Sequence, residues 1–242
     1  MRSALVVLTL AAPLAVASDS ASIPAFSAQG PREGLPAPWR ELVPPRARAA
    51  GFSLVDDAGV TVLRVRSHAA AGAASYALHA DAGEHPILAW RWKIDRVVAG
   101  ADLAAKSGDD FAARVYVFFD VPASELGVGA RVRLALARLF YGATLPGAAI
   151  CYVWDNRHPA GTAAWSAYTD RVRMVVLESG DGRAGQWAEE RRDLVADYRA
   201  AFGANAVLHD VSGIAAGNDT DQTGASATAW FGDFRLEPRG AR

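Results

Sequence analysis

The sequence predicts a mostly β protein, an antiparallel jelly-roll-like β-sandwich with one or two short helices. About nine short strand-like runs follow one another, separated by Gly, Pro and Asp. They do not alternate regularly with helices, which disfavours a doubly wound α/β fold. Of the 242 residues, 51% are apolar, enough for a sizeable core and too many for a disordered chain.

The strand-like runs begin near residue 51. The first two, 51–55 and 60–65, flank Asp56-Asp57-Ala58-Gly59 and predict a β-hairpin, because glycine accepts a positive φ in a tight turn. The remaining predicted strands span residues 75–79, 87–94, 112–120, 150–156, 172–178, 207–215 and 227–236.

Two segments have helical periodicity. Residues 130–140 place apolar side chains on one side and arginines elsewhere, which favours packing over the sandwich end, with binding to a membrane surface as the alternative. Residues 193–202 form the second predicted helix, which Gly203 ends.

The N-terminus predicts a signal peptide over residues 1–17. Arg2 is followed by an uncharged apolar run, 4–16, and by an Ala15-Val16-Ala17 cleavage site. The alternative is a buried N-terminal strand or helix. Residues 18–45, rich in Pro, Ser and Ala, predict an extended lead-in, and residues 46–238 a single β-sandwich domain. We therefore expect a periplasmic or secreted protein without a transmembrane segment in the mature chain.

Composition excludes several classes of function. The formal net charge of −1 provides no basic surface for nucleic acid. The five histidines lack zinc-ligand spacing, and the chain has no nucleophile elbow, P-loop or HExxH motif. Cys151 is the only cysteine and lies in an apolar run, so it predicts a core residue rather than a nucleophile. Oligomeric state is not predictable from these features.

Several predicted strands combine one apolar face with one face of cations and aromatic rings. If these strands are neighbours, the second face would suit a sugar, because rings stack on pyranoses and arginine forks bind hydroxyls or carboxylates. The alternative is an ordinary solvated outer face. The predicted ligand-binding residues are Arg91, Lys93, Arg114, Tyr116, Trp154 and Arg173.

Residues 218–224 place oxygen-bearing side chains at alternate positions before a glycine. This pattern resembles the opening of a calcium loop, with Asp219, Asp221 and Thr223 as ligands. Trp230 stands where the bidentate glutamate of such a loop belongs, so a turn that caps its own backbone is the alternative. Asp109, Asp110 and Asp233 would add ligands if the loops converge. We expect no cofactor other than this calcium ion.

Several segments in order resemble the bacterial family known as domain of unknown function 3047. They are Trp90-Arg91-Trp92-Lys93, the run Gly108-Asp109-Asp110-Phe111-Ala112-Ala113-Arg114-Val115-Tyr116, Tyr152-Val153-Trp154, residues 173–180, Asp197-Tyr198-Arg199, residues 219–224 and Phe231-Gly232-Asp233. The resemblance covers roughly residues 50–236. It implies an exported bacterial protein and brings no assigned catalytic residues.

The function that the residues favour is binding of a carbohydrate or similar polar ligand. A polysaccharide lyase on the same scaffold is an alternative, with Tyr116 or His158 as base and Arg114 neutralising a uronate carboxylate. An envelope structural or assembly protein without a small ligand is the third interpretation.

Overall fold

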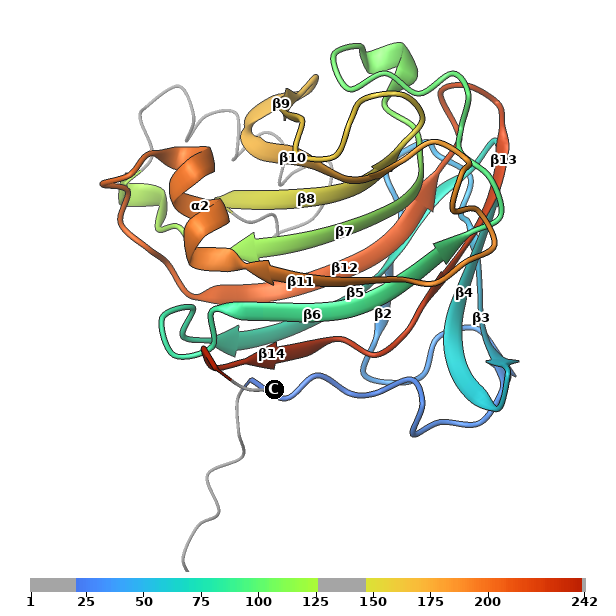
Figure 1. Cartoon of the computed structure of the whole chain (residues 1–242), viewed down its shortest axis with the longest axis horizontal. Helices are drawn as coiled ribbons and strands as arrows, with labels where there is room; N and C mark the ends of the chain where they lie inside the picture. The colour runs from blue at the N-terminus through green and yellow to red at the C-terminus, as the bar shows by residue number, and fades with distance from the viewer. Residues whose placement is uncertain (1–20, 126–146, 241–242) are drawn as a thin grey trace, which may run out of the picture.

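Two β-sheets packed face to face form the protein, which confirms the predicted β-sandwich (Figure 1). The computed structural model describes residues 21–125 and 147–240. The predicted helix over residues 130–140 lies outside these residues. No helix in the described part is long and apolar enough to span a bilayer.

The first sheet has seven strands in the order β1-β3-β4-β13-β6-β11, with β14 paired to β6. Their bounds are β1 Arg32–Glu33, β3 Gly51–Asp57, β4 Val60–His68, β13 Ser226–Phe231, β6 Ile87–Ile94, β11 Ala188–Asp193 and β14 Arg235–Glu237.

The second sheet has seven strands in the order β2-β5-β12-β7-β8-β10-β9. Their bounds are β2 Arg40–Leu42, β5 Ala71–Ala80, β12 Val211–Asp219, β7 Phe111–Phe119, β8 Ala148–Asp155, β10 Thr169–Ser179 and β9 Ala163–Ser166. Two short 3-10 helices complete the set, η1 Lys106–Gly108 and η2 Ala123–Glu125.

Every predicted strand is present, with local differences. The 227–236 segment is divided into β13 and β14, and β12 begins at Val211 rather than at residue 207. The sequence did not predict β1, β2, β9 or β11. One pair departs from the expected antiparallel pattern, because β8 and β10 run parallel.

Local chemistry accounts for the predicted hairpin and helix. In the β3–β4 turn, Ala58 and Gly59 have φ values of 55° and 84°, and the Asp56 carboxylate accepts the Gly59 N–H. Helix α2 (Leu194–Phe202) begins where Asp193 accepts the N–H groups of Val195 and Ala196.

A network of aromatic rings fills the space between the sheets. The ring centroids of Trp92 on β6 and Trp154 on β8 lie 5.9 Å apart, and those of Trp90 and Tyr152 lie 5.4 Å apart. All four rings are buried. Because β6 and β8 belong to different sheets, these contacts define which side of each strand faces the core.

Part of the lead-in also enters the core, which its composition did not predict. Phe26 is fully buried and Trp39 is 5% exposed, and their ring centroids lie 4.8 Å apart. Both rings also contact Phe234, which follows β13. The segment before β3 therefore contributes apolar burial to the sandwich.

Two late strands occupy interior positions in the two sheets. Strand β12 lies between β5 and β7, and β13 lies between β4 and β6. Each sheet is thus joined across its middle by a strand from the last part of the described chain (Figure 1).

Candidate functional site

The structure does not bring the six predicted ligand-binding residues to one face. Trp90 and Trp92 point into the core, so Arg91 and Lys93 lie on the opposite, outer side of the first sheet. Arg114 and Tyr116 belong to the second sheet. The prediction that the six residues share one surface is therefore wrong.

Within the second sheet, register separates the residues further. Tyr116 pairs with Cys151, whereas the core-facing Tyr152 pairs with Val115, so Tyr116 and Arg114 lie on the outer side of this sheet. Trp154 lies on the core side and is 1% exposed. It therefore cannot stack on a ligand at the surface.

Arg173 is also separated from Arg114. Its register with Ile150 places it on the same side of the second sheet as Tyr152. The Arg173 guanidinium lies 5.0 Å from the Trp165 ring centroid, near the β9 edge. The six residues thus occupy the outer side of the first sheet and the two opposite sides of the second.

Arg114 lies in a nearly closed environment. It is 4% exposed, and its Nη2 atom lies 3.4 Å from carboxylate oxygens of both Asp109 and Asp219. It also donates to the Asp109 carbonyl and, over 3.0 Å, to the Tyr116 hydroxyl. These contacts compensate its charge, because a buried cation without such partners would be strongly destabilising.

The same environment affects Tyr116 and Cys151. Burial raises the pKa of the Tyr116 hydroxyl well above its ordinary value, which makes that group a poor base at neutral pH. Burial also raises the pKa of the Cys151 thiol to about 12. Cys151 is fully buried, which confirms the core role predicted for it.

Asp110, Asp219 and Asp221 come together beside Arg114. One carboxylate oxygen from each lies within 4.8 Å of the other two, which is compatible with a cation. Thr223 contacts this group through Asp110. Its hydroxyl and its N–H both donate to the Asp110 carboxylate, each over 2.6 Å. Asp110, which the sequence suggested as an additional ligand, therefore joins Asp219 and Asp221, and it also holds the 219–224 turn.

A proton can occupy the same position. Burial raises the pKa of Asp219 to about 9 despite the opposing charge of Arg114, and a hydrogen bond with Asp221 raises it further in the same direction. Among the described residues, no partner is recorded for the Oδ1 atoms of Asp219 and Asp221. A proton shared by these carboxylates would satisfy them. Calcium at this position stays a prediction.

The other sequence-predicted acids have different partners. Asp109 pairs with Arg114, and Asp233 accepts hydrogen bonds from the N–H and hydroxyl of Ser27. His158 Nδ1 lies 3.1 Å from the buried Asp155 carboxylate.

The outer side of the first sheet carries a row of aromatic and cationic side chains. Lys93 Nζ lies 4.9 Å from the ring centroids of both Trp187 and Trp230. We call these three residues the indole row. Trp230 is the cross-strand partner of Lys93, and Trp187 immediately precedes β11, which pairs with β6 on the other side. Both indoles are partly exposed.

One carboxylate fixes this row. Asp57 Oδ2 lies 2.8 Å from Lys93 Nζ and accepts the Trp187 Nε1–H over 2.7 Å. The hydrogen bond from Lys93 is the main reason that the pKa of Asp57 is lowered. Arg91 extends the row, with its guanidinium carbon 4.4 Å from the Trp187 ring centroid.

The sequence identified the cations of this surface but not its rings. Trp230 could have been found from alternation, because Ala227, Ala229 and Phe231 define the apolar side of its strand. Trp187 gave no such signal, because the charged run that follows it did not predict a strand.

Comparison with known proteins gives one family match. The model of the family described as "Protein of unknown function (DUF3047)" matches residues 37–235. A search of curated proteins finds no match.

Solved structures with similar folds are distant in sequence. Endoglucanase cel12A from Rhodothermus marinus has 9% identity and a TM-score of 0.43, covering 86% of this chain and 98% of that one. The xyloglucanase domain of NopAA from Sinorhizobium fredii, in complex with cellobiose, has 8% identity, a TM-score of 0.43 and coverages of 85% and 100%. The native family 12 xyloglucanase from Bacillus licheniformis has 9% identity, a TM-score of 0.39 and coverages of 84% and 88%.

Proposed function

The chain belongs to the DUF3047 family of proteins of unknown function. From the side chains on its surface, we propose that it is an exported protein that binds carbohydrate. The binding surface is the outer side of the first sheet, centred on the indole row of Trp187, Lys93 and Trp230.

The observation that carries the proposal is the position of Lys93 between two partly exposed indoles. Indole rings stack on the apolar faces of sugar rings, and their N–H groups bind hydroxyls. Cations beside the rings supply hydrogen-bond donors for the same ligand. A flat sheet face with both kinds of group is suited to a chain of sugar rings.

The preorganisation of this surface supports binding. Asp57 holds Lys93 and Trp187 together, so the ring and the cation have little freedom left to lose when a ligand binds. The carboxylate also balances one of the two charges on Arg91 and Lys93.

Binding is favoured over the lyase interpretation by the state of two of the predicted catalytic groups, Arg114 and Tyr116. Arg114 is already paired with the Asp109 carboxylate, and the raised pKa of Tyr116 opposes its use as a base. Neither group is arranged to meet a uronate at the surface.

Export is the second part of the proposal, and residues 1–17 support it by their basic start, apolar run and small-residue cleavage site. Cell fractionation and N-terminal sequencing of the recovered protein test it. We expect a mature protein that begins at Ser18. A cytoplasmic protein that retains residues 1–17 would contradict export.

Carbohydrate binding is tested with a panel of neutral and acidic oligosaccharides against wild type, Trp230→Ala and Trp165→Ala. Trp165 is a matched control, because it is 39% exposed and belongs to β9 of the other sheet. We expect the loss of Trp230 to weaken binding by about tenfold, in keeping with one lost ring contact. Equal effects of the two substitutions, or no binding to any member of the panel, would contradict the proposal.

A further inference from the structure

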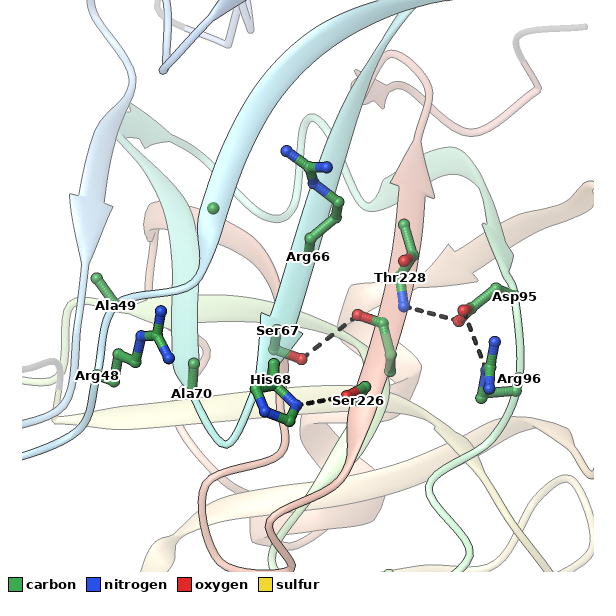
Figure 2. A pocket seen from close by; sticks show the side chains of 12 residues that line it. Arg48, Ala49, Arg66, Ser67, His68, Ala70, Asp95, Arg96, Ser226 and Thr228 are labelled. Carbon is green, nitrogen blue, oxygen red and sulfur yellow. Dashed lines mark hydrogen bonds and ion pairs between the residues drawn. The ribbon is translucent and has the colours of Figure 1, made fainter.

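A pocket of about 510 Å³ opens on the first sheet, at the end of β4 and beside the start of β13 (Figure 2). Its charged and titratable lining consists of Arg48, Arg66, His68, Asp95 and Arg96. We call it the arginine pocket. None of these residues was predicted from the sequence as part of a site.

The arginine pocket has an excess of positive charge. Three guanidinium groups and one carboxylate line it, and that carboxylate is already engaged. Asp95 accepts the Thr228 N–H over 2.7 Å and lies 3.1 Å from Arg96 Nε. In residues 21–125 and 147–240, no carboxylate forms an ion pair with Arg48 or Arg66.

His68 adds a donor to the same space. Its Nδ1 atom lies 2.7 Å from the Ser226 hydroxyl, and Figure 2 shows the ring between the Arg48 and Arg96 sides of the pocket. An arginine fork without a protein partner is well suited to bind a carboxylate or phosphate in a bidentate manner. The pocket therefore has the chemistry of an anion site.

The arginine pocket continues the surface of the indole row. In the register of β13 with β4, Thr228 pairs with Arg66 and Trp230 pairs with Arg64. Residues two apart on a strand point to the same side and lie about 7 Å apart. Arg66 thus lies one row beyond the indole of Trp230, on one continuous face.

From this arrangement we infer that the arginine pocket binds the carboxylate of an acidic sugar unit whose neighbouring units lie along the indole row. The inference rests on the proposed function and makes it more specific: the ligand is a polyuronate rather than a neutral glycan. Arg48 and Arg66 bind the carboxylate, and Trp230 stacks on an adjacent ring.

The test uses oligomers of galacturonate, mannuronate and glucuronate, each paired with its methyl ester. Esterification removes the charge and keeps the sugar ring. We expect at least one acidic oligomer to bind ten or more times more tightly than its ester. Arg66→Ala and Arg48→Ala should each reduce this preference, and Arg40→Ala, which removes an exposed arginine of the second sheet, should leave it unchanged.

A second measurement separates the two proposals. Thermal melts at constant ionic strength compare monomeric uronates with the matching neutral sugars and with inorganic phosphate. A rise in Tm that depends on Arg66 and is specific for the uronate supports the pocket, even if no oligomer binds. An equal rise with phosphate would show a general anion site and contradict the sugar assignment.

Binding of acid and ester with equal affinity would overturn the pocket assignment, and the proposed function would survive if that binding depended on Trp230. No response to any uronate, monomer or oligomer, would overturn the pocket assignment alone, because the proposed function is also tested with neutral oligosaccharides.

Discussion

Lys93 and Asp57 form an ion pair of 2.8 Å on the outer side of the first sheet, and the same Asp57 oxygen accepts the Trp187 Nε1–H. One carboxylate therefore sets the positions of a cation on β6 and of a ring just before β11. Its removal should alter the surface without disturbing the core.

Asp57→Ala tests this arrangement. We expect weaker binding of the oligosaccharide that the wild type selects, because Lys93 and Trp187 lose their shared anchor. Stability should change by no more than about 1 kcal/mol, since the pair is partly exposed. Isothermal titration and urea melts measure the two effects, with Asp120→Ala, which changes an exposed residue at the end of the second sheet, as the control. A large loss of stability with unchanged binding would contradict the assigned role.

Arg114→Ala should be strongly destabilising. The substitution removes the cation from a buried site and leaves the Asp109 carboxylate without its partner, which costs about 3–5 kcal/mol for comparable buried pairs. Urea unfolding measures this change, and exposed Arg40→Ala should have little effect. A change below about 1 kcal/mol would show that the ion pairs contribute little to the fold.

Asp219 predicts a pH dependence of stability. The pKa of Asp219 is about 9 in the folded protein and near the ordinary 3.8 in the unfolded chain. Between these two pH values the folded state holds a proton that the unfolded state has lost. Stability from this group therefore falls as pH rises from about 4 to about 9. Asp219→Asn removes the effect, so its Tm should increase relative to wild type between pH 5 and pH 9.

Exposed Asp120→Asn is the control for that comparison. A Tm difference between Asp219→Asn and wild type that stays constant with pH would contradict the raised pKa.

Calcium can be tested at the same carboxylates. An ion at Asp219 and Asp221 must displace the shared proton, so the rise in Tm caused by calcium should be larger at pH 9 than at pH 6. Asp221→Asn should reduce that rise. No response to calcium at either pH would contradict the predicted site.

Glu190 provides a second pH effect from a different part of the fold. Burial raises its pKa to about 7, although its Oε1 atom accepts the Trp92 Nε1–H over 3.0 Å. The folded state keeps this proton between about pH 4.5 and 7, so stability falls as pH rises through that window.

Glu190→Gln keeps the acceptor and removes the charge. Its Tm should exceed that of wild type at pH 8, and the difference should disappear below about pH 4.5. Glu189→Gln, on the exposed side of the same strand, is the control. The same Tm difference at both pH values would contradict the assignment.

Alternation and turn chemistry were sufficient to predict most strands, because each has a clear apolar side or a glycine-containing turn. Strand β11 was missed because the run from Glu189 to Asp193 is charged throughout, and its pairing to β6 depends on tertiary contacts. Sequence alternation also placed Arg91 and Lys93 together correctly.

The prediction that the six ligand-binding residues share one surface was wrong for a different reason. Alternation assigns residues to two sides of a strand, but it does not say which side faces the core. Tyr116 and Trp154 each lie on an aromatic side of their strands, yet the register between β7 and β8 places one outward and the other inward. The sheet in which each strand pairs, and not its composition, decides which side chains share a surface.

The interior positions of β12 and β13 have a consequence for how the chain acquires its structure. Neither sheet can form completely until β12 and β13 have been made. Without these strands, β5 has no link to β7 and β4 has no link to β6. A nascent chain emerging from the ribosome would therefore remain unable to complete either layer until residues 211–231 have been synthesised. Such non-local pairing slows folding and leaves unpaired strand edges exposed for longer.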